Sequence, residues 1–307
     1  MASRRVSDEY LLSIMKPYYP IACSVPILPR RTEGDPESKI TLSIIIVNWN
    51  TKEALKGCLE SIYASGLHFF EIIVADNASE DGSISMLEEE FPQVRLIKNT
   101  RNVGFARASN QGMFLSRGDH ILLLNSDTQI EAQALRRIIE FMEEHPQAGA
   151  MGPRLVLPDG RPQPYSFGCD PTLGYLLRRG LNLFLRKGYL HDWGTEEIRE
   201  VDWVSGASLM LRRRALEETG LLDENFFLYF EDNDLCLRLR QKGWKVYFNP
   251  MVQVIHLGGE SLVKNEPARA EYYRSLLYFY SKHYGKLKTA VLITLLPLYR
   301  WLVRLRR

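Results

Sequence analysis

Several features that commonly identify a protein class are missing from this chain of 307 residues. Its cysteines (Cys23, Cys58, Cys169 and Cys236) lie far apart with no C-x-x-C spacing, which disfavours a zinc site and favours reduced thiols in a cytosolic setting. The sequence has no G-x-x-x-x-G-K-[ST] loop, no G-x-G-x-x-G after its first apolar run and no G-x-S-x-G. These absences disfavour a P-loop nucleotidase, a dinucleotide dehydrogenase and an α/β hydrolase.

An excess of one charge and a long hydrophobic run are also missing. The 39 Lys and Arg residues against 37 Asp and Glu residues give a net charge of +2, too balanced to indicate a nucleic-acid partner. No apolar run reaches the roughly 18 residues of a membrane span, and no apolar signal core follows the basic N-terminus. With 45% hydrophobic residues, the chain has the composition of a globular protein with a large core.

From residue 40 onward, apolar runs alternate with amphipathic segments. The run from Leu42 to Val47 is nearly continuous and β-branched, as in a strand that is buried on both faces. We expect strands at 42–47, 71–76, 94–97 and 120–125, and helices at 51–64, 83–91, 106–117 and 131–145. This alternation predicts an α/β fold with a parallel sheet between helices, and a ligand at the carboxyl ends of the strands.

The second half of the chain is less regular. Strands are expected at 151–157, 202–212, 245–248 and 252–256, a helix at 231–243, and a loop-rich connection at 161–199. We divide the chain into an N-terminal extension and linker (1–39), a main domain (40–262) and a helical, basic and apolar tail (263–307).

The tail combines apolar and basic residues. Residues 289–303 are largely apolar but are interrupted by Pro297 and Arg300, and residues 286–307 include basic but no acidic side chains. Such a segment can lie in a membrane interface rather than cross it. The alternative is a terminal helix that docks on the domain or on a partner subunit.

Acidic and polar side chains follow two of the predicted strands. A carboxylate at Asp76 can accept hydrogen bonds from a planar base, although the residues after it can also simply cap the next helix. In the segment Asn125-Ser126-Asp127, the carboxylate can bind a divalent cation that bridges a diphosphate. The alternative is that Asp127 caps a helix whose first turn lies at 128–131.

The segment Glu231-Asp232-Asn233-Asp234 places three carboxylates within four residues. Neighbouring negative charges raise the proton affinity of one member, which suits a general base. Acidic residues at a helix start also complement the helix dipole, so a structural role is compatible with a catalytic one. His256 ends an apolar strand and can contact a metal or phosphate, or be structural.

Taken in order, these segments resemble inverting glycosyltransferases of family 2 with the GT-A fold, especially the branch that contains bacterial rhamnosyltransferases. The matching segments are 43–50, 71–79, 102–112, 124–128, 206–210, 230–238 and 254–256. The resemblance covers about residues 41–262 and implies a GT-A domain with a mostly parallel central sheet.

The resemblance also implies roles for individual residues. Asp232 would be the catalytic base, and Asp127 and His256 would bind a divalent cation, Mg²⁺ or Mn²⁺. The D-x-D position of the family reads Asn125-Ser126-Asp127 here, so one carboxylate is missing from it, and we still expect a cation. The residues expected to bind the nucleotide sugar are Asn48, Asn50, Asp76, Asn102, Gly104, Asn125, Ser126 and Glu231.

The implied activity is transfer of a sugar, with rhamnose from dTDP-rhamnose as the first expectation and UDP- or GDP-sugars as alternatives. The acceptor would be a glycan or a lipid-linked sugar in cell-surface polysaccharide assembly, at the cytoplasmic face of the membrane. A rival interpretation is a non-catalytic nucleotide-sugar-binding or scaffold protein, which the presence of Asp76, Asp127 and Asp232 disfavours. A nucleotidyltransferase is disfavoured because its Gly-rich basic loop is absent after the first strand.

Overall fold

The computed structural model describes residues 25–28, 40–185, 189–258 and 266–304. Most of the predicted N-terminal extension and linker therefore lies outside the described residues, as do residues 259–265 and 305–307. The first elements in chain order are β1 (Leu42–Asn48), α2 (Lys52–Ala64), β2 (Phe70–Asp76), α3 (Ser83–Glu90), β3 (Arg95–Lys98), α4 (Phe105–Leu115), β4 (His120–Asn125), β5 (Thr128–Ile130), α5 (Ala134–Glu144) and β6 (Ala148–Val156). They are followed by β7 (Phe167–Gly168), α6 (Leu173–Phe184), β8 (Arg199–Glu200), β9 (Trp203–Val204), β10 (Ser208–Arg212), α7 (Arg213–Thr219), α8 (Glu231–Gln241), β11 (Lys245–His256), α10 (Glu266–His283) and α11 (Gly285–Arg304).

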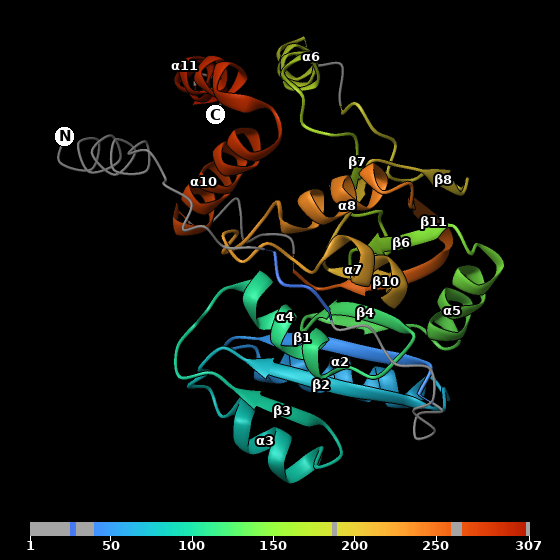
Figure 1. Ribbon diagram of the computed structural model, residues 1–307. Helices are drawn as coiled ribbons and strands as arrows, with labels where there is room; N and C mark the ends of the chain where they lie inside the picture. The colour runs from blue at the N-terminus through green and yellow to red at the C-terminus, as the bar shows by residue number, and fades with distance from the viewer. Residues whose placement is uncertain (1–24, 29–39, 186–188, 259–265, 305–307) are drawn as a thin grey trace.

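The central sheet has the strand order β3-β2-β1-β4-β10-β6-β11-β5, and β8 pairs with β11 (Figure 1). β1 is parallel to β2 and β4, β2 is parallel to β3, and β6 is parallel to β11. β10 lies antiparallel between β4 and β6, so β4 and β6 point the same way. Most strands therefore share one direction, which confirms the predicted α/β fold with a mostly parallel sheet.

Helices cover both faces of this sheet. The side chains of β1 alternate between two apolar clusters, with Ile44 and Ile46 in one and Ile45 in the other. The first cluster contains buried residues of α2, α3 and α5, and the second contains those of α4, α7 and α8. Burial on both faces explains why β1 is apolar at almost every position rather than at every second one.

A third apolar cluster attaches the C-terminal helices. Tyr278, Phe279 and Tyr280 of α10 pack against Phe226 and Phe230, which precede α8. Figure 1 places α6, α10 and α11 at the end of the molecule opposite β3 and α3. The C-terminal helices thus lie beside the segment that leads into α8.

Two predicted strand boundaries are wrong. The strand expected at 202–212 is divided into β9 and β10, because the backbone N–H groups of Ser205 and Gly206 bond to Ser166 O and Asp232 Oδ2 instead of to a neighbouring strand. The strands expected at 245–248 and 252–256 form one strand, β11, whose register against β6 shifts between Asn249 and Gln253. Pro250 lies in that irregular stretch, where its missing N–H causes no loss.

Two helix predictions are also wrong. Residues 128–130 do not begin a helix but form β5, which pairs with the end of β11, and α5 begins only at Ala134. The loop-rich connection at 161–199 contains the helix α6. Its apolar residues recur at helical spacing, and Leu173 and Leu176 pack on the protein, so the sequence carried a helix signal that the prediction overlooked.

Candidate active site

The carboxyl ends of β1, β2 and β4 lie side by side. Asn48 at the end of β1 lies opposite Asp76 at the end of β2, and Val47 lies opposite Asn125 at the end of β4. Polar residues that are far apart in the sequence therefore meet at one edge of the sheet, where parallel α/β folds bind ligands.

A hydrogen-bond network joins the loops that follow β1 and β2. Asn48 Nδ2 donates to Asp76 Oδ2 (2.8 Å) and to Ser79 Oγ (3.1 Å). The backbone N–H of Ser79 donates to Asp76 Oδ1 (2.8 Å), and that of Asn50 donates to Ser79 Oγ (2.9 Å). Asn48 and Asp76 are completely buried and hold the two loops together, while Asn50 is exposed. The contact of Asp76 with a nucleobase stays a prediction.

Thr51 extends this network to the end of β4. Its hydroxyl donates to Asn48 Oδ1 (2.7 Å) and lies 2.8 Å from the hydroxyl of Ser126. Because the Thr51 proton is used on Asn48, the Ser126 hydroxyl is the donor in the second bond. Ser126 is buried and links the loops after β1 and β2 to the Asn125–Asp127 segment.

The loop after β3 carries Asn102 and Gly104. Asn102 Oδ1 accepts hydrogen bonds from the N–H of Gly104 (2.9 Å) and from Asn77 Nδ2 (3.2 Å). Gly104 has a φ of 87°, and a Cβ at this position would lie 2.7 Å from the carbonyl oxygen of Phe227. Glycine is therefore required where this loop meets the segment before α8.

Asp127 and His256 face one another. Asp127 Oδ1 lies 3.1 Å from His256 Nε2, and Asn125 Nδ2 lies 3.3 Å from the same nitrogen. His256 Nδ1 lies 2.8 Å from Gln163 Oε1, an oxygen that only accepts, so Nδ1 carries a proton. Burial favours a raised pKa for Asp127, but the hydrogen bond and charge of His256 outweigh it and lower the pKa.

This pair fits a divalent cation. Carboxylate and imidazole are both ligands of Mn²⁺, whereas Mg²⁺ prefers oxygen. A histidine that binds a metal commonly donates its other N–H to a carbonyl oxygen, as His256 does to Gln163. Within the described ranges no group of three His, Cys, Asp or Glu side chains gathers as a metal site, so phosphate oxygens of a ligand would have to complete the coordination.

Asp232 lies in the first turn of α8 and is partly buried. Its Oδ2 accepts from the N–H of Gly206 (2.9 Å), and its Oδ1 accepts from the N–H of Asn233 (2.8 Å). Burial raises the pKa of Asp232 despite these two hydrogen bonds. Burial and the charge of Asp232 raise the pKa of the neighbouring Glu231 well above its usual range, and Glu231 Oε2 has no hydrogen-bond partner.

A short backbone bridge connects Asp232 to the cation pair. Gly206 binds the carboxylate of Asp232, and the carbonyl oxygen of the next residue, Ala207, accepts from the N–H of Asn125 (2.9 Å). Asn125 in turn contacts His256. The predicted base and the predicted cation ligands thus belong to one connected site.

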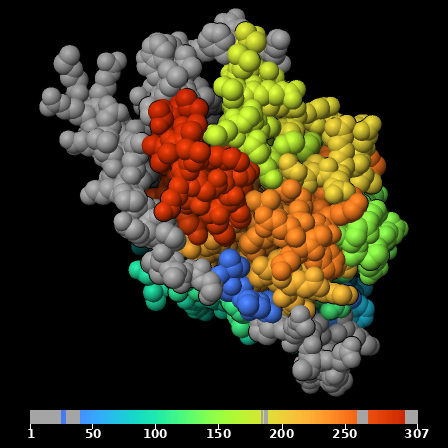
Figure 2. Space-filling view, turned by 45° about the horizontal axis from the view of Figure 1, so that its top comes forward, coloured from blue at the N-terminus to red at the C-terminus, as the bar shows by residue number. Residues whose placement is uncertain are grey.

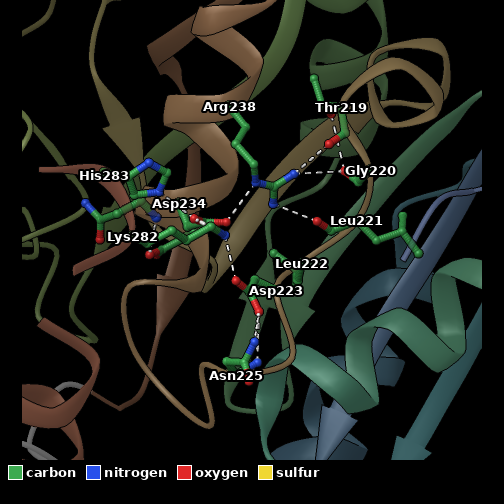
Figure 3. Close-up of polar contacts among 12 residues, drawn as sticks. Thr219, Gly220, Leu221, Leu222, Asp223, Asn225, Asp234, Arg238, Lys282 and His283 are labelled. Atoms are coloured by element: carbon green, nitrogen blue, oxygen red, sulfur yellow. Dashed lines mark hydrogen bonds and ion pairs between the residues drawn. The ribbon is translucent and has the colours of Figure 1, made fainter. Parts of the chain in front are cut away.

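Asp234, the third carboxylate of the cluster, has a structural role. It is completely buried, and its oxygens bind Arg238 Nε (2.8 Å), Lys282 Nζ (2.6 Å) and His283 Nε2 (2.7 Å), as Figure 3 shows. Burial opposes ionisation, yet the hydrogen bond to His283 and the charges of Arg238 and Lys282 keep the pKa of Asp234 well below its usual range. It therefore accepts no proton at neutral pH.

Sequence reasoning missed several residues of this site. Gln163 and Thr51 connect the predicted residues but lie in segments without a chemical motif, and Gly206, within the matching segment 206–210, was given no role of its own. Gly258 was also missed, although a Cβ there would collide with the carboxylate of Asp127. The signal for Gly206 was the small-residue segment Gly206-Ala207-Ser208 in the middle of an expected strand. The described cysteines Cys58, Cys169 and Cys236 are free thiols, as expected.

Comparison with protein families agrees with this geometry. The model of glycosyl transferase family 2 matches residues 43–195, and the model of glycosyl transferase family group 2 matches residues 120–303. Together they cover the strand ends, Asp127, Asp232 and His256.

Similar sequences include two rhamnosyltransferases. An N-acetylglucosaminyl-diphospho-decaprenol L-rhamnosyltransferase of Mycobacterium tuberculosis is 26% identical over 80% of this chain and 85% of its own length. The rhamnosyltransferase WbbL of Escherichia coli is 25% identical over 69% of this chain and 82% of its own length.

Similar solved structures share the fold. GalNAc-T7, crystallised with UDP, GalNAc and Mn²⁺, has a TM-score of 0.56 and 17% sequence identity over 81% of this chain and 51% of its own. TarS of S. aureus has a TM-score of 0.52 and 16% identity over 78% of this chain and 39% of its own. This chain spans about half or less of those structures, and both support the GT-A fold.

Proposed function

The chain belongs to glycosyltransferase family 2, and from that premise we propose that it is an inverting enzyme in which Asp232 activates the acceptor. The observation that carries this proposal is the position of Asp232, whose carboxylate is fixed by two backbone N–H groups and is linked through Gly206 and Ala207 to the Asn125–Asp127 segment. A raised pKa makes this carboxylate a stronger base than an exposed aspartate.

The proposed reaction is a single displacement. Asp232 takes the proton of an acceptor hydroxyl while that oxygen forms a bond to the anomeric carbon of the donor sugar. The bond from this carbon to the diphosphate oxygen breaks, and the nucleoside diphosphate leaves with the bonding electrons. One carboxylate suffices, because inversion requires no covalent sugar–enzyme intermediate.

The donor would bind along the carboxyl ends of the strands. Asn48, Asn50 and Asp76 would line the nucleotide pocket, and the Asn102–Gly104 loop would approach the nucleotide and phosphates. Asn125, Ser126 and Glu231 would complete the nucleotide-sugar site between these loops and Asp232. The buried network among the loops after β1 and β2 supports this proposal, because it fixes their conformation before a ligand binds.

A divalent cation, Mn²⁺ or Mg²⁺, would be held by Asp127 and His256. When bound, it supplies positive charge that stabilises the departing diphosphate. The Mn²⁺ in the GalNAc-T7 structure and the paired side chains of Asp127 and His256 support this assignment.

The donor we propose is dTDP-rhamnose, and the acceptor is a glycan or lipid-linked sugar used in cell-surface polysaccharide assembly. The names of the M. tuberculosis and E. coli relatives support rhamnose, and the former supports a lipid-linked acceptor. UDP- and GDP-sugars are the alternatives that a donor screen must include.

We further propose that α11 contacts the cytoplasmic face of a membrane. Among the described helices, none has the length and apolarity to cross a bilayer. Leu287, Val291 and Leu295 are exposed at helical spacing on α11, and Lys286 and Lys288 flank Leu287. Figure 2 shows this helix beside α6 on one face of the molecule, and the two helices contact each other. Exposed leucines with adjacent lysines are typical of helices in an anionic membrane interface.

A donor screen tests the function. Purified protein would be titrated with dTDP-, UDP- and GDP-sugars, with and without Mn²⁺ or Mg²⁺, while thermal stability and nucleoside diphosphate release are measured. We expect one donor to stabilise the protein and to be turned over in the presence of metal, and Asp232→Asn to bind this donor without turnover. Equal turnover by Asp232→Asn would exclude Asp232 as the base, and failure of every donor to bind would exclude the proposed donor site.

A further inference from the structure

Tyr165 lies on a segment that is tied to the candidate active site on both sides. On one side, Gln163 Oε1 lies 2.8 Å from His256 Nδ1, the imidazole that pairs with Asp127. On the other side, the carbonyl oxygen of Ser166 accepts from the N–H of Ser205 (2.9 Å). Ser205 precedes Gly206, whose N–H binds Asp232. The segment that carries Tyr165 is thus bonded to the cation pair on one side and to the residue before Gly206 on the other.

The backbone at Tyr165 is strained in a way that presents its ring to solvent. Its φ is 64°, in the left-handed region that a bulky residue rarely adopts, and its side chain is 43% exposed. Strain of this kind persists where surrounding contacts impose it, and it often marks a functional position. Here the residues on both sides of Tyr165 are held by the hydrogen bonds of Gln163 and Ser166.

Further aromatic side chains gather around Tyr165. Its ring centroid lies 5.0 Å from that of Trp193, and the ring of Tyr189 lies 4.9 Å from Trp193 on another side. Trp193 is buried, and its indole N–H donates to the carbonyl oxygen of Phe167 (3.0 Å). Trp193 is therefore fixed in place and supports the two tyrosine rings. Tyr189, like Tyr165, is exposed, at 56%.

A cation completes this group. The guanidinium of Arg179 on α6 lies 5.0 Å above the ring of Tyr165, and its Nη2 donates to the Tyr165 hydroxyl (3.1 Å). Residues 171–191 include basic but no acidic side chains. Leu177 and Leu181 are exposed on the side of α6 away from Arg179, because residues two positions apart on a helix point in nearly opposite directions.

We propose that Tyr165, Tyr189 and Arg179 form the binding site for an acceptor of the type sugar–diphosphate–lipid, an inference that rests on the proposed glycosyl transfer. The C–H face of a sugar ring packs against aromatic side chains, which line many ligand sites. A guanidinium binds phosphate oxygens with two parallel hydrogen bonds. The sugar would lie on the tyrosines and the diphosphate at Arg179, and the lipid would extend outward from the diphosphate.

Binding to defined acceptor analogues tests this site. The full-length protein would be titrated with short-chain prenyl diphosphates that carry N-acetylglucosamine, glucose or galactose, in the presence of the nucleoside diphosphate identified by the donor screen. We expect the wild type to bind at least one of them, and Tyr165→Ala and Tyr189→Ala each to weaken this binding at least about tenfold. A prenyl diphosphate without a sugar is expected to bind these tyrosine variants and the wild type alike, whereas Arg179→Gln weakens the binding of both ligand types.

Phe114→Ala is the matched control, because Phe114 is 44% exposed and lies on α4 outside the aromatic group. It is expected to leave acceptor and donor binding unchanged.

Donor affinity, measured on every variant, separates the two proposals. A wild type that binds its donor but none of the prenyl diphospho-sugars, or tyrosine variants with unchanged acceptor affinity, would overturn the acceptor site alone. If a soluble glycosyl diphosphate binds as tightly as the same compound with a prenyl chain, the lipid does not contribute to binding and that part of the proposal is wrong. If the wild type binds no donor, the proposed function itself is rejected.

Discussion

Asp234 Oδ1 lies 2.6 Å from Lys282 Nζ, an ion pair through which α10 holds the first turn of α8 (Figure 3). Lys282 also lies 2.6 Å from Asp223 Oδ2, so one ammonium group neutralises two buried carboxylates. Asp234 follows Asp232 by two residues on α8. α10 therefore helps to hold the turn of α8 that carries the proposed base.

Replacement of Lys282 by Met is expected to destabilise the protein by about 2 kcal/mol, because it leaves Asp223 and Asp234 buried with fewer cationic partners. Urea unfolding at pH 7 measures this loss. The control is Lys98→Met, whose exposed pair with Glu88 contributes little. If both variants unfold at the same urea concentration as the wild type, the buried pair does not hold α10 in place.

The lowered pKa of Asp234 also predicts how the stability of the protein depends on pH. The pKa of this aspartate is lowered in the folded state, so its contribution is complete above the ordinary aspartate pKa of about 3.9 and is lost as the pH falls further. Wild-type stability should therefore fall on acidification below about pH 4 more steeply than that of Asp234→Asn. Parallel slopes for the two proteins in acid urea titrations would show that Asp234 is not the responsible group.

The pH dependence of catalysis is expected to reflect Asp232. Since burial raises the pKa of this carboxyl group, the rate should begin to fall at a pH above the ordinary value of about 3.9, where Asp232 becomes protonated. The measurement is kcat/KM between pH 4 and 8, with donor affinity determined at each pH. A rate that stays constant down to pH 4 would show that no raised carboxyl pKa limits the reaction.

Metal affinity is expected to depend on Gln163 as well as on the direct ligands. Gln163→Leu removes the acceptor for His256 Nδ1, and such a loss commonly weakens metal binding about 10- to 100-fold. Electron paramagnetic resonance of free Mn²⁺, with nucleoside diphosphate present, measures this affinity. Gln147→Leu is the control, because the side chain of Gln147 donates to the Tyr247 hydroxyl, near the opposite end of β11 from His256. Equal Mn²⁺ affinity in the wild type and Gln163→Leu would count against His256 as a ligand.

Alanine substitutions at two glycines distinguish the cost of a positive φ from the cost of a steric clash. Gly104 and Gly160 have similar positive φ values, 87° and 81°, but only Gly104 has neighbouring atoms where a Cβ would lie. Gly160→Ala should cost about 1 kcal/mol for its φ alone. Gly104→Ala should cost at least about 2 kcal/mol more and lower donor affinity, because it pushes the loop away from Phe227. Equal losses in thermal and urea unfolding would show that the Gly104–Phe227 contact is not tight.

The early strands and helices were predictable because each has a strong periodic signal. β1 is apolar at most positions, and Leu55, Leu59 and Ile62 lie on one face of α2, so burial determines both elements. β5 was not predictable in this way, whereas α6 has apolar residues at helical spacing and was overlooked. β5 has only three residues and exists because the end of β11 pairs with it.

The site was predictable in its residue types but not in its connections. Strand ends and the Glu231–Asp234 cluster indicated Asp76, Asp127 and Asp232 from the sequence. Asp234 is structural and Asp232 is left as the proposed base because Lys282 and His283 bind Asp234. These two residues lie about 50 residues further along the chain. No local pattern could show which carboxylate these residues neutralise.

The membrane contact of α11 is expected to depend on its exposed leucines. Leu287 is 80% exposed, so Leu287→Glu should leave folding intact while it places a negative charge against anionic lipid. Sedimentation with vesicles of phosphatidylglycerol and phosphatidylcholine measures binding, which we expect to fall several-fold. Met251→Glu changes a residue that is 53% exposed on β11 and adds the same charge away from α11, so it controls for net charge. If the two variants lose vesicle binding equally, the attraction is a general charge effect and α11 is not the docking helix.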